Sequence, residues 1–181
     1  MRCLALLVLS LLASVPSAAE GQEGPDSPTV VYVVRHPERL DDGAPAGAEM
    51  QDPPLSEAGM ARAQELVEVF RSAGLTHIHS TDYARTRDTA RPVSEALRLD
   101  IEIYDAADIP SFAERLRDSP GTHLVVGHSN TGPALVEALG GEAGEPIAPL
   151  EYDRAYVVVV LPGGATGSAV FRYGSPYRDG P

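Results

Sequence analysis

Val30-Val31-Tyr32-Val33-Val34 runs directly into Arg35-His36, and this stretch decides the fold. The apolar run of mostly β-branched residues predicts a buried strand. Arg35 and His36 follow at its carboxyl end, which is where open α/β sheets bind their ligands. A guanidinium and an imidazole placed together at a strand end are typical of a phosphate site. The guanidinium can donate hydrogen bonds to phosphate oxygens, and the imidazole can attack phosphorus.

Two later segments repeat the arrangement of a strand followed by a polar turn. Residues 80–90, Ser-Thr-Asp-Tyr-Ala-Arg-Thr-Arg-Asp-Thr-Ala, follow a strand-like stretch at residues 76–79 and contain Arg85. Residues 124–126 lead into Gly127-His128-Ser129-Asn130 in the same way. Four residues therefore stand just beyond predicted strands: Arg35, His36, Arg85 and His128.

At these motifs the sequence resembles the histidine phosphatase superfamily, the phosphoglycerate mutase-like group, and in size its short bacterial members. That family carries Arg-His-Gly after the first strand, then Ser-x-x-x-Arg-(Ala or Thr)-x-x-Thr-Ala, then Gly-His after a later strand. All three motifs occur here in that order between Val30 and Tyr173. Pro37 departs from the pattern, since the family usually has Gly or Ala there. Because proline fixes φ, Pro37 could alter the turn that aims His36.

The resemblance implies a metal-independent phosphatase of the histidine acid type that forms a phosphohistidine on His36 and needs no cofactor. Arg35, Arg85 and His128 would hold the phosphoryl oxygens. The further substrate contacts expected near the phosphate are Glu38, Ser129 and Asn130. The expected substrate is a small phosphorylated molecule or a phosphohistidine.

The proton for the leaving group has no single expected donor. Larger family members place an acid beyond the third strand, and Asp105 stands nearest that position; Asp108, and Glu38 two residues after the nucleophile, are alternatives. The chain could also lack a dedicated acid, as the short phosphohistidine phosphatases do, because phosphoramidates need less help to leave.

Other readings stay open beside the phosphatase. A protein that binds a phosphorylated ligand without turning it over would use the same arginine-histidine pocket, and a phosphomutase would return the phosphoryl group to a second hydroxyl. His77 and His79 point to one face of a strand, but no third ligand is evident, so no metal site is predicted.

Composition limits the compartment and the partners. Residues 1–19 have the positive start, short apolar run and small-residue end of a signal peptide, so we expect export to the periplasm or the exterior. The only cysteine, Cys3, lies in this segment, so the mature chain cannot form a disulfide. The formal net charge of −12 and the absence of lysine argue against nucleic acid and anionic membranes as partners.

The remaining chain predicts a leader at residues 20–28, one domain at 29–174 and a frayed tail at 175–181. Helices are expected at 56–74 with Ser56 as N-cap, at 85–97 with a bend or break near Pro92, at 111–118 and at 133–139. Strands are expected at 30–34, 77–80, 101–104, 122–126, 156–161 and 168–173, and residues 40–54 should form a long loop beside the site. This alternation predicts a three-layer α/β/α sandwich whose central sheet is mostly parallel, with an antiparallel C-terminal edge. The oligomeric state is not predicted.

Overall fold

The computed structural model describes residues 27–45, 47 and 50–178. The predicted signal peptide, and the leader as far as residue 26, lie outside the described residues. Within the described part, no helix combines the length and the apolar character that crossing a membrane requires. The strands are β1 (Thr29–Arg35), β2 (His77–Ser80), β3 (Ile101–Ile103), β4 (Gly121–Gly127), β5 (Arg154–Val160) and β6 (Thr166–Arg172). The helices are α1 (Glu57–Phe70), α2 (Ala84–Leu97), α3 (Ile109–Arg117) and α4 (Thr131–Ala138).

The strands form one six-stranded sheet in the order β3-β2-β4-β1-β5-β6. The first four strands in this order are parallel, and β5 and β6 add an antiparallel hairpin at one edge. The predicted mostly parallel sheet with an antiparallel C-terminal edge is therefore confirmed.

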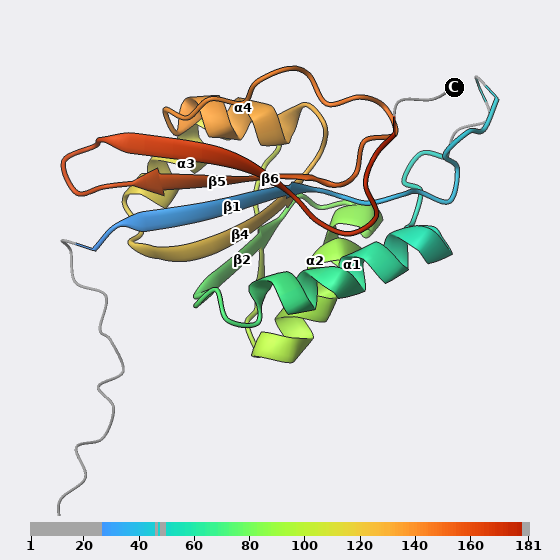
Figure 1. Cartoon of the computed structure of the whole chain (residues 1–181), viewed down its shortest axis with the longest axis horizontal. Helices are drawn as coiled ribbons and strands as arrows, with labels where there is room; N and C mark the ends of the chain where they lie inside the picture. Colours follow the sequence, from blue (N-terminus) through green and yellow to red (C-terminus); the bar gives the residue numbers. More distant parts are fainter. Residues whose placement is uncertain (1–26, 46, 48–49, 179–181) are drawn as a thin grey trace, which may run out of the picture.

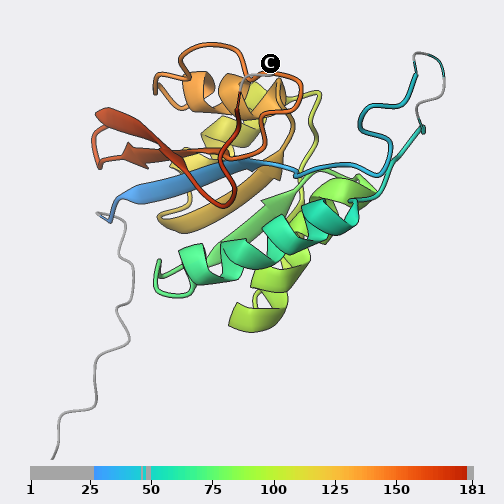
Figure 2. The same ribbon diagram turned by 45° about the vertical axis from the view of Figure 1, so that its right-hand side comes forward.

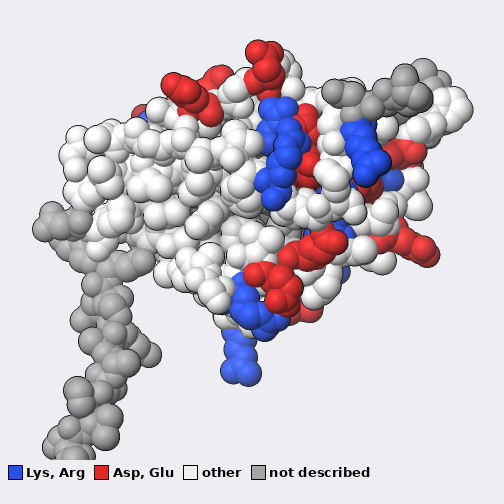
Figure 3. Space-filling model, viewed as in Figure 1, with Lys and Arg blue, Asp and Glu red and all other residues white. Residues whose placement is uncertain are grey.

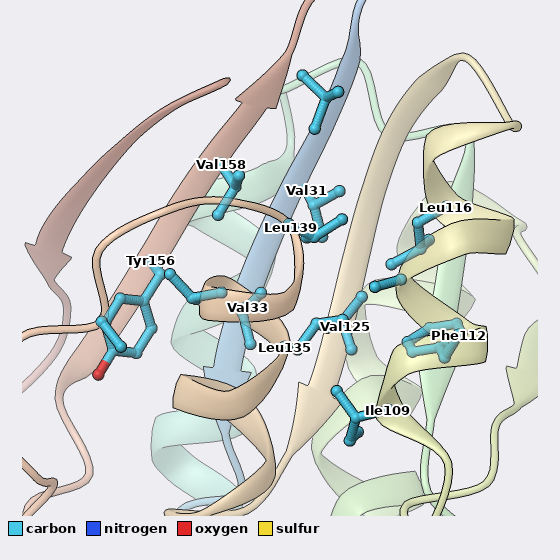
Figure 4. Close-up of a cluster of buried hydrophobic side chains, with 14 of the residues drawn as sticks. Val31, Val33, Ile109, Phe112, Leu116, Val125, Leu135, Leu139, Tyr156 and Val158 are labelled. Carbon is cyan, nitrogen blue, oxygen red and sulfur yellow. The ribbon is translucent and has the colours of Figure 1, made fainter. Parts of the chain in front are cut away.

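Helices cover both faces of the sheet, which makes three layers. In Figures 1 and 2, α1 and α2 lie on one side of the sheet, and α3 and α4 lie on the other. Strand β1 supplies both cores because successive side chains point to opposite faces. Val31 and Val33 pack under α3 and α4, a cluster that Figure 4 shows, whereas Val34 packs against α1 and α2.

Two helix boundaries and the expected interruption near Pro92 differ from the sequence expectation. Ser56 does cap α1, accepting a bond from Gly59 N at 3.1 Å, but the helix ends at Phe70, well before Gly74. Helix α3 begins at Ile109 because Asp108, and not Ser111, is its N-cap residue. Helix α2 continues through Pro92 without a break.

The start of the tail is attached to the body, unlike the frayed segment that the sequence suggested. The backbone N–H of Tyr177 donates to Asp153 Oδ2 at 2.9 Å, and the carbonyl of Ser175 accepts from Arg62 Nη1 at 3.0 Å. These bonds attach Ser175 to Arg62 of α1 and Tyr177 to Asp153, the residue before β5.

Strand register decides what meets at the carboxyl edge of the sheet. Arg35, the last residue of β1, pairs with Gly127, the last residue of β4, and His36 N donates to Gly127 O at 3.0 Å. Ser80 at the end of β2 pairs with Val126 on the other side of β4. The residues that follow the three strands are therefore neighbours.

Candidate active site

A cavity of about 700 Å³ opens at this edge of the sheet. It is lined by Arg35, His36, Arg39, Tyr83, Arg85, Ala106, Ala107, His128, Ser129, Asn130, Thr131, Ile147 and Pro149. The structure thus brings together the four strand-end residues that the sequence singled out. Of the further substrate contacts that were expected, Ser129 and Asn130 also lie on the wall.

The imidazole of His36 is held in one orientation by the residue that departs from the family pattern. His36 Nδ1 lies 2.8 Å from the carbonyl oxygen of Pro37. A carbonyl oxygen can only accept, so Nδ1 carries the proton and Nε2 keeps its lone pair. Pro37 therefore orients the ring through its backbone oxygen, which does not depend on the side chain at that position.

The guanidinium of Arg35 sits in a cradle of backbone carbonyls. Nη1 donates to the carbonyls of Ala148 and Glu151, both at 2.9 Å, and Nη2 donates to Pro149 O at 2.8 Å. The ring of Tyr152 lies under the same group, 4.3 Å from Cζ to the ring centroid. These contacts fix the plane of a buried guanidinium without adding a countercharge.

Arg85 is fixed by a different set of contacts. Its Nη1 lies 3.2 Å from Asp52 Oδ1, and its Cζ lies 4.4 Å from the centroid of the Tyr83 ring. Asp52 also accepts from Ala84 N at 3.1 Å, so it caps the start of α2, where Tyr83 makes no side-chain cap. One carboxylate from the loop at residues 40–54 therefore stabilises both the helix and the arginine.

In Arg35 and in Arg85, the Nε atom has no hydrogen-bond partner among the described residues. Arg35 Nε and Arg85 Nε are buried, and neither makes a hydrogen bond within the described part of the chain. An unpaired buried donor is costly, so such groups in native proteins usually await a ligand or an ordered water. Because both residues line one cavity, a tetrahedral oxyanion there would satisfy the two donors together.

His128 lies beside His36, with 5.4 Å between the ring centroids and an angle of 67° between the ring planes. Its Nε2 lies 2.9 Å from Thr81 Oγ1, which in turn lies 2.9 Å from Thr86 Oγ1. This pair of hydroxyls holds the imidazole from one edge. Thr81 stands four residues before Arg85, the place of the serine in the family's second motif, and sequence reasoning gave it no role.

Gly127 is required by close approach of its neighbours. A Cβ built at Gly127 would lie 2.7 Å from Tyr104 Oη and 2.8 Å from Thr131 Oγ1. Thr131 Oγ1 also accepts from His128 N at 2.9 Å, which fixes the backbone of the second histidine. The Gly-His motif therefore positions His128 through the backbone at the start of α4.

Burial keeps both histidines unprotonated. Burial, together with the smaller effects of Arg35, His128 and Arg85, lowers the pKa of His36 from its ordinary value to about 3, although the Pro37 carbonyl acts in the opposite direction. Burial followed by the charges of Arg85 and Arg35 lowers the pKa of His128 to about 4. At neutral pH the site thus combines two neutral imidazoles with cationic arginines.

Two predicted site residues are not brought to this cavity. Glu38 pairs with Arg62 of α1, with its Oε1 2.7 Å from Arg62 Nη2, and it faces away from His36. Asp105 is exposed, and its Oδ1 accepts from Ala107 N at 2.8 Å within a tight turn. Among the described residues no carboxylate lines the cavity, so the structure offers no acid where Asp105 was expected. Asp108, the alternative, caps α3 instead.

The remaining histidines form a stack away from the cavity. The rings of His77 and His123 lie 4.6 Å apart, and His79 Nε2 lies 3.0 Å from His123 Nδ1. No group of three or more His, Cys, Asp or Glu within the described ranges could hold a metal ion. One hydrogen bond thus joins the rings of His79 and His123, and His123 Nε2 donates to Ser119 O at 2.9 Å.

The surface charge is mixed around the arginines. On the face in Figure 3, arginine side chains lie next to acidic ones and form no broad positive patch. The cavity differs, because three arginines and no carboxylate line it among the described residues. An anion is therefore attracted locally despite the net charge of −12.

Comparisons with known proteins agree with this geometry. A model of the histidine phosphatase superfamily (branch 1) matches residues 31–108. A Proteus mirabilis protein named "Probable phosphoglycerate mutase GpmB" is 41% identical over 71 residues, which are 39% of this chain and 33% of that protein. The match thus spans about a third of the length of this curated relative.

Solved structures extend the similarity over most of the chain. A structure from Agrobacterium tumefaciens assigned to the phosphohistidine phosphatase SixA is 26% identical, with a TM-score of 0.54, covering 72% of this chain and 90% of that one. The α-ribazole phosphatase of Shigella flexneri has the same fold, with a TM-score of 0.67 at 13% identity over 83% of this chain and all of that one. Three motifs in order, a shared fold and the match of residues 31–108 to the family model together support the histidine phosphatase superfamily as the family that this chain resembles.

Proposed function

We propose that this chain is a metal-independent phosphatase of the histidine acid type that acts through a phosphohistidine on His36. The observation that carries the proposal is an imidazole whose Nδ1 is engaged, so that Nε2 keeps its lone pair, together with two buried arginine Nε donors that have no partner among the described residues, and all three residues line one cavity. A phosphoryl group would supply the oxygens that these donors need and the phosphorus that the imidazole attacks.

The reaction would proceed in two steps. The lone pair on His36 Nε2 forms a bond to phosphorus while the bond to the leaving group breaks, and that group departs with the bonding pair and takes up a proton from solvent water. Water then attacks phosphorus, the P–N bond breaks, and dihydrogen phosphate leaves while His36 returns to its neutral form. Arg35, Arg85 and His128 would hold the phosphoryl oxygens throughout, and Ser129 and Asn130 would add polar contacts at the start of α4.

The lack of a carboxylate on the cavity wall favours good leaving groups. A phosphoramidate, such as a phosphohistidine, or an ester of an acidic hydroxyl needs no strong proton donor. SixA, a fold neighbour, is named for activity on phosphohistidine, and the α-ribazole phosphatase for activity on an ester. We therefore propose a small phosphorylated molecule or a phosphohistidine as substrate, met outside the cytoplasm if the predicted signal peptide is cleaved.

Trapping the covalent intermediate tests the proposal. Wild-type protein mixed with p-nitrophenyl phosphate and quenched in alkali should carry a phosphate that is stable to alkali and lost in acid, as phosphohistidine is. His36→Asn should carry none and should not turn over. His77→Asn removes an imidazole outside the cavity and should behave as wild type. Turnover by His36→Asn would refute the assignment.

A second comparison tests the arginine clamp. Arg85→Ala should lower kcat by about a hundredfold or more, because one preorganised donor contributes about 3 kcal/mol to transition-state stabilisation. Arg87→Ala removes an arginine of the same helix that pairs with Asp82 outside the cavity, and it should keep the wild-type rate.

The same experiments separate the alternatives. Vanadate binding by a wild-type protein that never turns over would identify a binding protein. Transfer of the phosphoryl group to a second hydroxyl of a sugar phosphate would identify a mutase.

A further inference from the structure

Arg39 is a third arginine on the cavity wall, and neither step of the proposed reaction uses it. Its backbone is anchored although it lies at the start of a long loop. Arg39 pairs with Leu55 in an isolated antiparallel bridge, and Leu40 N donates to Pro54 O at 2.9 Å. The position of Arg39 is therefore set by the fold.

The guanidinium of Arg39 is bound to the rest of the described chain through Nε. Nε donates to Asp42 Oδ1 at 3.0 Å and lies 3.4 Å from Asp41 Oδ1. Asp42 is itself fixed, because its Oδ2 accepts from Arg39 N at 2.7 Å and from the hydroxyl of Tyr152 at 2.5 Å. Neither Nη atom of Arg39 has a hydrogen-bond partner in the described part of the chain, so the outer edge of the guanidinium is a fixed, unused fork.

The other two arginines are held in the opposite way. Arg35 and Arg85 are bound through their Nη atoms and leave Nε free, and these two Nε donors suffice for the oxygens of one phosphoryl group. The Nη edge of Arg39 is therefore an additional donor set in the same cavity. Its charge is close enough to lower the pKa of both other arginines.

The cavity has room for more than a phosphoryl group. Its volume of about 700 Å³ lies within the range of pockets that enclose whole small molecules. Three arginines and no carboxylate of the described residues line the wall, and Asp41, Asp42 and Asp52 lie behind it as partners of Arg39 and Arg85, so a second negative group would meet cationic side chains first. A neutral leaving group would leave the fork of Arg39 without an anionic partner.

We infer that Arg39 is a specificity-determining residue that selects substrates carrying a second anionic group, a carboxylate or a second phosphate, on the part that leaves. The inference rests on the proposed function, because it takes the scissile phosphoryl group to lie between His36 and the two Nε donors. It adds to that function the charge of the leaving group.

Nonhydrolysable ligands test this without requiring turnover. Calorimetry on the full chain would compare methylphosphonate, which has one anionic head, with phosphonoacetate and 3-phosphonopropionate, which add a carboxylate, and with methylenediphosphonate, which adds a second phosphonate. Wild-type protein should bind at least one two-headed ligand about tenfold or more tightly than methylphosphonate, the gain expected of a charge-assisted bidentate pair. The ligand that shows the gain distinguishes a carboxylate from a phosphate.

Variants assign the gain to Arg39. Arg39→Gln should reduce the ratio of the two dissociation constants to within about threefold of unity, whereas Arg39→Lys should retain part of it because it keeps the charge and loses the fork. Arg71→Gln removes an exposed arginine of the α1 C-terminus and should leave the ratio unchanged.

Two results would overturn the inference: equal affinity of wild type for one-headed and two-headed ligands, or an unchanged ratio in Arg39→Gln. A chain that never forms a phosphohistidine but shows the Arg39-dependent ratio would refute the proposed reaction and leave the second anion subsite standing.

Discussion

Lowering the pH from about 6.5 to about 5 should destabilise the folded protein by about 2 kcal/mol for each of two buried histidines, His79 and His123. These side chains are 6% and 1% exposed. Burial, together with the smaller effect of neighbouring histidines, lowers the pKa of His79 to about 3 and that of His123 to about 4. In the unfolded chain each imidazole regains a pKa of about 6.5.

The direction of the stability change depends on whether the folded or the unfolded chain binds more protons. Between about pH 6.5 and about pH 4 the unfolded chain holds one more proton per histidine than the folded chain, so stability falls as the pH falls. The slope is about 1.4 kcal/mol per pH unit for each group, which gives about 2 kcal/mol over one and a half units. Above about pH 6.5 both states are neutral and the contribution is constant.

Urea denaturation at several pH values measures this effect. The double variant His79→Gln, His123→Gln should show a loss of unfolding free energy between about pH 6.5 and about pH 5 that is smaller than the wild-type loss by up to about 4 kcal/mol. Carboxylates other than Glu102, whose Oε2 lies 3.5 Å from His79 Nδ1, have the same surroundings in both proteins, so their titration cancels from the difference. Ile78→Val, a change at a fully buried neighbour, should lower stability equally at every pH. Parallel pH curves for wild type and the double variant would refute the reasoning.

Three further changes separate residues of the fold from residues of the site. Gly59→Ala places a Cβ 2.2 Å from the backbone oxygen of Glu38 and should lower the unfolding free energy by about 1–3 kcal/mol. Gly167→Ala places its Cβ in open space and should leave the unfolding free energy unchanged. Equal melting temperatures of the two variants would contradict this prediction. Glu38→Gln should destabilise the chain by removing the countercharge of a half-buried arginine of α1, yet kcat/KM should stay within about twofold, since kinetic loss would place Glu38 in the site after all. Asp52→Ala should lower the unfolding free energy by about 1 kcal/mol, because α2 loses its cap, and should lower kcat about tenfold, because Arg85 loses its partner. A lower unfolding free energy with a wild-type kcat would show that Asp52 acts only as a cap.

The core of the site could be predicted because it lies at strand ends. Parallel strands bring their carboxyl ends to one edge of a sheet, so a motif after each apolar run predicts a meeting point. The observed register, with Arg35 opposite Gly127, places His36 and His128 side by side as that rule requires. The sequence also carries the cap of α1 and the terminal hairpin, because Ser56 and the Gly-rich turn are local signals.

The supports of the site could not be predicted. Arg35 is held by carbonyls of residues 148–151, which follow it by more than a hundred positions and form no helix or strand. Every residue has a carbonyl, so the sequence gives no sign of which ones converge on a guanidinium. Tyr152 and Arg39 were missed for the same reason, since their roles depend on a loop path that periodicity does not describe.

Asp105 shows the limit of reasoning from position along the chain. It follows β3, as an acid in a larger family member would, but β3 ends at Ile103 and the chain then turns tightly. Inside a turn no period fixes where a side chain points, and a carboxylate two residues before a free N–H readily bonds to it. Asp105 bonds to Ala107 N, so the backbones of Ala106 and Ala107 and not the carboxylate reach the cavity.

This acidic protein can attract anions because the three cavity arginines are held by hydrogen-bond partners that do not themselves line the cavity wall, with the exception of Pro149. Asp42 and Asp52 each bind one arginine directly and so offset part of its charge, whereas the direct partners of Arg35 are neutral carbonyls and the charges of Asp42 and Glu151 act on it without a hydrogen bond. The arginine with the least direct charge compensation therefore adjoins His36 in the sequence, where the phosphoryl group would bind, and Arg39 carries a directly bound countercharge. This difference would place the scissile group on the nucleophile first and leave the second anion of a substrate to the residue that can discriminate among leaving groups.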